Sequence, residues 1–185
     1  MILTAAIAVI AAEGVHGTTT RKIAARAGIN LGTLHYHFES KEEVLASAVA
    51  YLAGTYRQNL DRAFPLPEPL HDRIANLMRF IWGEVRQSPQ EQVALFDMLL
   101  YTLTEEGLRR FPKQTQSPYQ QLYREALEKS SDVQDGTVAA DIEPLADFLF
   151  NGFVGILLQW LATDQTARAE EQLEVLVRAA RRIFL

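Results

Sequence analysis

The chain has 185 residues, of which 48% are hydrophobic and 22% charged, and it contains no cysteine. This balance is typical of a globular protein, and the lack of cysteine excludes disulfides and thiolate metal sites and fits the cytoplasm. The formal net charge of −5 argues against a protein that coats nucleic acid, although residues 1–41 contain four basic side chains against two acidic ones. A small, mildly basic head on an acidic body fits this distribution. No apolar run reaches the roughly 20 residues of a membrane span, so we expect no membrane partner.

Apolar residues recur at spacings of three and four along most of the chain, which predicts an all-α protein. The first helix starts near Ile2 and ends at Gly14. The threonines at 18–20 offer hydroxyl caps for a short second helix, and Gly28 fits the chain reversal after it because a positive φ is cheap only without a Cβ. A third helix is expected over residues 30–38.

The fourth helix is predicted to begin after Ser40, an N-cap residue with Glu43 at the capping-box position. It continues to about Ala63. The sequence PLPEP at 65–69 then breaks it, because proline lacks an amide donor and clashes with the preceding turn. This segment is the clearest linker in the chain.

Further helical patterns follow the linker. Between the third and fourth of them, the polar, glycine-containing segment 130–141 is expected to be a connection. The helices are expected over about residues 74–85, 91–110, 119–129, 143–163 and 167–184.

The most informative segment is 19–45, TTRKIAARAGINLGTLHYHFESKEEVL. In a helix-turn-helix, one helix braces the backbone and the next enters the major groove, which requires small residues where the helices touch and a tight turn between them. The inner side of the bracing helix has suitable residues in Ile23, Ala24 and Ala27, with Gly28 at the turn. The second helix can be anchored by Ile29, Leu34 and Phe38. The residues left to point outward are Asn30, Gly32, Thr33, His35 and Tyr36.

This segment resembles the DNA-binding head of the TetR family of bacterial regulators, whose pattern runs approximately as a threonine and then IA..AGVS.GTLY.HF.SKE.L. The matching residues, at fixed spacing and without gaps, are Ile23-Ala24, Ala27-Gly28-Ile29-Asn30, Gly32-Thr33-Leu34, His37-Phe38, Ser40-Lys41-Glu42 and Leu45. The resemblance implies a three-helix DNA-binding head at residues 1–45. It also implies a larger helical-bundle body at 46–185 that binds a small ligand and dimerises.

The resemblance also assigns roles in DNA binding. Thr18 or Thr19 would contact a phosphate at the start of the bracing helix, together with backbone N–H groups. Thr33 and Tyr36 would face the bases, and Lys41 would neutralise a phosphate. The full set of predicted DNA contacts is Thr18, Thr19, Asn30, Leu31, Gly32, Thr33, His35, Tyr36 and Lys41.

Three features depart from the family pattern. His35 stands where the family usually has tyrosine, which puts that phosphate contact in doubt. Leu31 stands where it often has lysine, so a charged contact is lost and Leu31 could instead touch a thymine methyl. The family also commonly has a basic arm before its first helix. Either residues before Met1 are missing from this sequence, or the protein contacts fewer phosphates.

The body contains many large, adaptable side chains, which either form a packed core or line a cavity. The resemblance implies a ligand cavity whose occupation moves the fourth helix and, with it, the reader helix. An apolar cavity suits a flexible or aromatic ligand, so the small-molecule effector is expected to be largely apolar. The predicted lining residues are Met78, Trp82, Phe96 and Tyr101.

The helix at 143–163 is apolar over most of its circumference and must therefore be buried. With the last helix, it could form a four-helix seam between two chains, whose two-fold symmetry would match a palindromic operator. The alternative is that both helices close the core of one chain. The residues predicted for the seam are Phe148, Gly152, Phe153, Ile156, Trp160, Leu173, Leu176 and Ala180.

No sequence pattern indicates catalysis, a cofactor or a metal. The nucleophile-elbow, P-loop and dinucleotide motifs are missing, and His35 and His37 are two apart and point to different faces of a helix. We therefore predict a homodimeric repressor that binds a double-stranded operator and is released by the effector through a population shift. The alternatives are a small-molecule-binding bundle that has lost specific DNA binding, and a helical-bundle enzyme.

Overall fold

The computed structural model describes residues 1–104 and 118–185. Every regular element within these ranges is an α-helix, so the predicted all-α class is confirmed. By their contacts, the residues divide into two compact units. One consists of Met1–Thr55 and Val85–Thr115, and the other of Tyr56–Glu84 and Gln116–Leu185. This division differs from the functional boundary expected after residue 45, which stays a prediction.

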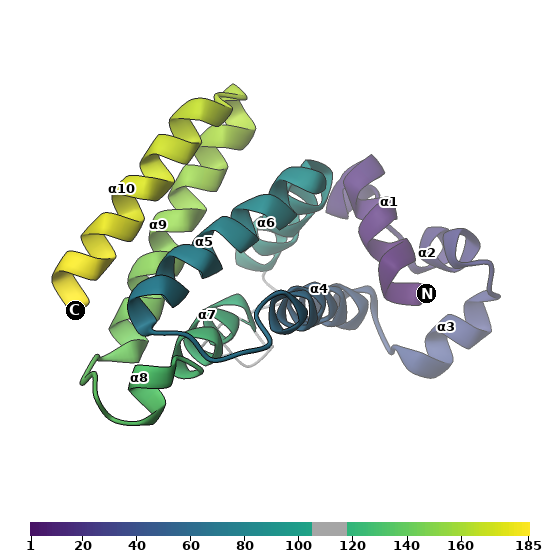
Figure 1. The fold of residues 1–185 in the computed structure, drawn as a ribbon. Helices are drawn as coiled ribbons and strands as arrows, with labels where there is room; N and C mark the ends of the chain where they lie inside the picture. Colours follow the sequence, from purple (N-terminus) through teal and green to yellow (C-terminus); the bar gives the residue numbers. More distant parts are fainter. Residues whose placement is uncertain (105–117) are drawn as a thin grey trace. The chain divides into compact units, whose positions relative to one another are not determined.

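The first unit holds the three short helices of the expected head, the start of α4, the end of α5 and the helix α6 (Figure 1). Their bounds are α1 Ile2–Gly17, α2 Thr20–Ala27, α3 Leu31–His37, α4 Lys41–Ala63, α5 Leu70–Gln87 and α6 Pro89–Thr104. The predicted helices at 30–38 and from Ser40 to Ala63 are therefore confirmed. The pattern expected to carry α6 to about residue 110 continues into positions outside the described residues.

The core of the head is small and built from the apolar positions of four helices. Leu34 of α3 is fully buried and opposes Ile23 and Ala24 of α2, and the short side chain of Ala24 lets the two helices approach closely. The fully or almost fully buried members are Ala6, Ile23, Ala24, Leu34 and Val44. The partly buried residues packed against them are Ile2, Leu3, Ile29, Leu31 and Phe38.

Two glycines set helix ends in the head. Gly14 has a φ of 70° and interrupts α1 before its last turn, where the sequence predicted that the first helix ends. Gly28 has a φ of 69° and ends α2, with its N–H donating to the carbonyl of Ala25 at 3.2 Å. Both conformations lie in the left-handed region, which glycine adopts without the clash of a Cβ.

The start of α4 is capped much as its sequence predicts. The hydroxyl of Ser40 accepts a hydrogen bond from the N–H of Glu43 at 3.1 Å. The Glu43 carboxylate accepts from the N–H of Glu39 at 2.7 Å, one residue before the one that a standard capping box satisfies. The two bonds together fix the direction in which the chain leaves α3 and enters α4.

The second unit contains the remaining helices, including the larger part of α5. It holds α7 Pro118–Glu128, α8 Ser131–Gln134, α9 Ile142–Thr163 and α10 Thr166–Phe184. The single turn α8 was not predicted, because the sequence around it is polar and contains a glycine. It forms part of a contact with the linker, which holds it in place.

Helices α9 and α10 run side by side as a hairpin, closed by Asp164, which has a left-handed φ of 55° (Figure 1). Helix α9 also packs against α7. Among the described helices, α9 is long and apolar enough to cross a membrane by length and composition. One such helix is weak evidence, since the core helix of a globular protein has the same character.

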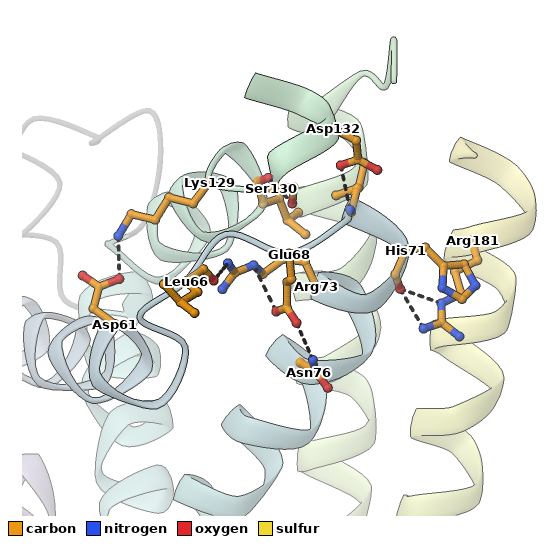
Figure 2. Close-up of polar contacts among 12 residues, drawn as sticks. Asp61, Leu66, Glu68, His71, Arg73, Asn76, Lys129, Ser130, Asp132 and Arg181 are labelled. Atoms are coloured by element: carbon orange, nitrogen blue, oxygen red, sulfur yellow. Dashed lines mark hydrogen bonds and ion pairs between the residues drawn. The ribbon is translucent and has the colours of Figure 1, made fainter. Parts of the chain in front are cut away.

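Polar contacts tether the linker between α4 and α5 (Figure 2). Arg73 is almost completely buried, and its Nε lies 3.2 Å from Oε1 of Glu68 in the linker. The other oxygen of Glu68 accepts from the Asn76 amide at 2.7 Å. Burial of a guanidinium is tolerable only with such a partner, so the proline-rich break is a fixed corner of the second unit.

Helices α8 and α10 add further bonds to the same corner (Figure 2). The N–H of Ser131 donates to the Glu68 carbonyl at 2.9 Å, and the N–H of Leu70 donates to Asp132 at 2.8 Å. The Arg181 guanidinium donates twice to the His71 carbonyl, at 2.9 and 2.7 Å. The side chain of Asp132 thereby supplies the acceptor that the first N–H of α5 lacks within its own helix.

Candidate nucleic-acid interface

Helix α3 has one buried side and one open side. Leu34 anchors it in the core of the head, whereas Gly32, His35 and Tyr36 on the other side are exposed. The ring of Tyr36 is 83% exposed, and it meets His37 edge-on at 5.1 Å between ring centroids. A large aromatic side chain held outward on a short, anchored helix is available to a partner, as the sequence predicts for a reader helix.

The N-terminus of α3 is tightly organised by Asn30. Its Oδ1 accepts from the Thr33 N–H at 2.7 Å and from the Thr33 hydroxyl at 3.0 Å. A Cβ on Gly32 would lie 3.3 Å from that same oxygen, so glycine leaves room for the cap. Asn30 and Thr33 are therefore held together by these two bonds. The side-chain N–H donors of Asn30 and a lone pair on the Thr33 hydroxyl are left to contact a ligand.

Thr18 does not occupy the place predicted for it. Its side chain is 1% exposed, and its hydroxyl donates to the Gly14 carbonyl at 2.7 Å. The N-cap of α2 is Thr19, whose exposed hydroxyl accepts from the N–H of Lys22 at 3.2 Å. Three consecutive threonines made the cap ambiguous, and the break at Gly14 explains the outcome, because it leaves a carbonyl that Thr18 satisfies.

Leu31 also departs from its predicted position. It is only partly exposed and packs against the core of the head. Leu31, which stands where the family often has lysine, thus helps to anchor α3 on the core of the head. This placement explains why an apolar residue is accepted at the first position of the reader helix.

The basic side chains of the head differ in what they contact. Lys22 forms a close ion pair with Glu13 and donates to the Gly17 carbonyl at 2.8 Å, which neutralises its charge. Lys41 is half-buried and donates to the carbonyl of Val15 at 3.2 Å. Arg21 and Arg26 of α2 are exposed. The sequence analysis did not select these two arginines, although their charge on the bracing helix was a visible signal.

The four residues predicted to line a ligand cavity do not fall in one compact unit. Met78 and Trp82 belong to the second unit, and Phe96 and Tyr101 to the first. Met78 is fully buried. The ring of Trp82 packs edge-on against Trp160 at 5.1 Å, and its Nε1 donates to Glu170 at 3.2 Å. These contacts make Trp82 a packing residue between α5 and the α9–α10 hairpin.

Tyr123 of α7, which the sequence analysis did not select, has a buried hydroxyl with no hydrogen-bond partner among the described residues. Its ring meets Phe150 edge-on at 5.6 Å. Burial raises the pKa of Tyr123 above its usual range, so the hydroxyl stays protonated. An unpaired buried hydroxyl is unfavourable by about 1–3 kcal/mol, which makes this position a candidate contact for a bound polar atom.

Five of the residues predicted for the dimer seam are buried within the single chain. They are Phe153, Ile156, Trp160, Leu173 and Ala180. Gly152 allows α9 and α10 to approach, because a Cβ there would lie 2.5 Å from a methyl carbon of Leu176. Phe148 is half-buried and packs against Phe184 at 5.8 Å. The apolar residues that these two helices leave exposed are different ones, namely Leu158, Val175 and Ile183.

Comparison with known proteins agrees with the geometry of the head. Residues 2–48 match the family described as bacterial regulatory proteins, tetR family. The HTH-type transcriptional repressor KstR2 of Mycolicibacterium smegmatis is 44% identical over 66 residues, which cover 34% of this chain and 32% of KstR2. The HTH-type nicotine-responsive transcriptional repressor HdnoR of Paenarthrobacter nicotinovorans is 24% identical over 178 residues, covering 96% of this chain and 91% of HdnoR.

Solved structures share the whole fold. A putative transcriptional regulator from Pseudomonas aeruginosa PAO1 has a TM-score of 0.70 at 21% identity, covering 100% of this chain and 92% of that one. A TetR-family member from Streptomyces coelicolor A3 has a TM-score of 0.66 at 26% identity, covering 96% and 94%. The match to the head and the relatives agree that residues 2–48 are a DNA-binding head of the bacterial tetR regulatory family, and the solved structures share the fold of the whole chain.

Proposed function

We propose that this protein is a homodimeric transcriptional repressor in the cytoplasm that binds a palindromic operator through α3 and is released by a small organic effector. The observation that carries the proposal is the open side of α3, where Gly32, His35 and Tyr36 are exposed above the buried anchor Leu34. The relatives KstR2 and HdnoR are described as repressors, which supports the same activity here.

In this proposal, the contacts divide into positioning and reading. Thr19 at the start of α2 and Lys41 at the start of α4 contact phosphates on either side of the reader helix. The exposed Arg21 and Arg26 add phosphate contacts from α2. Asn30 and Thr33 lie at the N-terminal end of α3, the end that contacts base edges in helix-turn-helix proteins, and Tyr36 lies about one turn further along the helix. In the proposal, the amide of Asn30 and the side chains of Thr33 and Tyr36 contact base edges.

The DNA claim is tested by a mobility-shift assay with duplex fragments from the region upstream of the protein's own gene. A specific complex that resists unrelated competitor DNA is expected. A folded dimer that retards none of these fragments at low salt contradicts the proposal. The same result would favour the alternative, a ligand-binding bundle without specific DNA binding.

The proposed dimer uses the exposed side of the α9–α10 hairpin. The open side of α10 includes Ala167, Glu170, Glu171, Glu174, Val175 and Arg178. The first half of α10 is acidic at residues 170–174, and its second half is basic at 178–182. Two copies related by a two-fold axis across α10 would therefore bring opposite charges together. Light scattering at micromolar concentration tests the dimer, and a monomer mass would contradict it.

The proposed effector is a small, largely apolar organic molecule with at least one polar atom. Tyr123 supports the polar atom, because its buried hydroxyl has no partner among the described residues. The relative HdnoR is a nicotine-responsive repressor, which supports a molecule of this kind. Nicotine is a suitable first probe in a thermal-shift screen. A ligand that stabilises the protein yet leaves its operator complex intact would contradict release.

A further inference from the structure

The break in α1 leaves a backbone N–H group without its partner in the helix. Gly14 leaves the helical conformation, so the N–H of Val15 loses the partner that an unbroken helix would give it. Val15 is completely buried, and water cannot satisfy that group. An unpaired buried N–H is unfavourable, so a side chain from another element must supply the acceptor.

Asp97 of α6 supplies it. The Val15 N–H donates to Oδ2 of Asp97 at 2.6 Å, although the two residues are 82 positions apart in sequence. A Cβ on Gly14 would lie 3.2 Å from the same oxygen. Glycine at position 14 therefore serves two purposes, because it permits the positive φ and lets the carboxylate approach the backbone.

The carbonyl of Val15 is held from a different helix. The ammonium of Lys41, in the first turn of α4, donates to that carbonyl at 3.2 Å and lies 4.6 Å from the centroid of the Tyr101 ring. The Tyr101 hydroxyl donates to Glu42 at 3.2 Å, which fixes the ring. Asp97 and Tyr101 are four residues apart on α6 and therefore lie on the same side of it.

The surroundings of Lys41 differ from those of Lys22 in one important respect. Lys22 is paired with the carboxylate of Glu13, which cancels its charge. Lys41 is held by a carbonyl and an aromatic face, and none of the described carboxylates pairs with it. Both partners orient the ammonium without neutralising it, so its full charge stays available to an anion.

We propose that Asp97 and Tyr101 are positioning residues, which hold the end of α1 and the ammonium of Lys41 in place for a DNA phosphate. The inference rests on the proposed DNA-binding function and adds two residues of α6 to it. Tyr101, predicted from the sequence as a ligand contact, acts in this account on the DNA side through Lys41. In this role, the side chain of Tyr101 would touch neither the DNA nor the effector.

The first test measures the affinity for random-sequence duplex DNA at several salt concentrations, because a phosphate contact does not depend on sequence. Lys41→Ala is expected to weaken binding about three- to tenfold and to reduce the salt slope by about 0.9, the value of one phosphate contact. Tyr101→Leu should reproduce most of this change, and Tyr101→Phe, which keeps the ring, should not. Asp97→Asn keeps an acceptor for Val15 and should bind better than Asp97→Ala.

Two comparisons make this test specific. Val93→Ala changes an exposed residue of the same helix and should bind as the unmodified protein does. The double variant Lys41→Ala/Tyr101→Leu should bind no worse than Lys41→Ala alone, because both changes remove the same contact. Additive losses, or Tyr101→Leu with an unchanged salt slope, would overturn the proposal.

A second test needs no DNA and separates failure of this inference from failure of the proposed function. The lysines are reductively methylated with ¹³C, and the Lys41 signal is assigned with Lys41→Arg. Ring current from Tyr101 should shift this signal upfield in the unmodified protein and in Tyr101→Phe, but not in Tyr101→Leu. A Lys41 signal without that shift in the unmodified protein overturns the inference, whatever the DNA assay shows. The shift without DNA binding would leave the contact in place and reject its proposed use.

Discussion

Helix α3 and the α9–α10 hairpin were both predicted to contact a partner, yet they use their apolar residues differently. In α3, Leu34 is fully buried and Leu31 packs beside it, and three of the residues predicted for a partner, Gly32, His35 and Tyr36, are exposed. In the hairpin, five of the eight residues predicted for a partner are buried inside the chain itself. A short helix has few apolar residues, and they can pack on only one side. A helix that is apolar all round has several, and its sequence does not rank them.

The largest expected effect tests the hairpin. Phe153→Ala should lower the free energy of unfolding by about 3–5 kcal/mol, because it leaves a cavity in a packed core. The affinity of dimerisation should change little. Denaturant unfolding and analytical ultracentrifugation measure the two quantities separately. A variant that folds with unchanged stability but no longer dimerises would return Phe153 to the seam between chains.

Thr18→Ala should have the next largest effect, on stability rather than on DNA binding. The change leaves the Gly14 carbonyl without its donor, which is unfavourable by about 1–3 kcal/mol. The folded fraction should bind DNA with unchanged affinity. Thermal unfolding and a binding titration, both corrected for folded protein, decide whether Thr18 contributes to the fold or to a phosphate contact.

Thr19→Ala provides the matched comparison one residue later. Loss of the N-cap should destabilise the protein by about 1 kcal/mol, and loss of an exposed hydroxyl at a helix N-terminus should also weaken DNA binding. The salt dependence of binding should remain close to that of the unmodified protein, since threonine carries no charge. Weaker DNA binding by Thr18→Ala than by Thr19→Ala would reverse the assignment.

Val175→Glu should leave the fold almost untouched and weaken the dimer. The residue is 54% exposed, and changes at such positions usually alter stability by no more than about 0.5 kcal/mol. A new carboxylate beside the acidic half of α10 should repel the partner at low salt, and added salt should restore part of the affinity. Light scattering across a dilution series gives the answer, and an unchanged dissociation constant would place the interface elsewhere.

Much of the head was predictable because its signals are local. Gly28, the Ser40 cap and the anchor Leu34 each follow from a few neighbouring residues, and the structure contains all of them. The burial of Thr18 and the role of Asp97 were not predictable in the same way. Both depend on the break at Gly14 and on a hydrogen bond between residues 82 positions apart.

The second unit was predictable in its helices but not in its contacts. The apolar spacing located α9 and α10, whereas the partner of Trp82 depends on which helix faces it across the core. The turn α8 exists because Asp132 caps α5 and Ser131 binds the linker, which are long-range contacts. Local propensity at a polar segment contains no information about them.

Selection of bound duplexes from a random DNA pool tests the central claim most directly, namely that the open side of α3 reads an operator. The unmodified protein should enrich a two-fold symmetric sequence. Tyr36→Ala changes a residue that is 83% exposed, so it should fold normally and lose preference at matching positions in both half-sites. If the unmodified, folded dimer enriches no sequence, or if Tyr36→Ala enriches the same one, α3 is not the reading element.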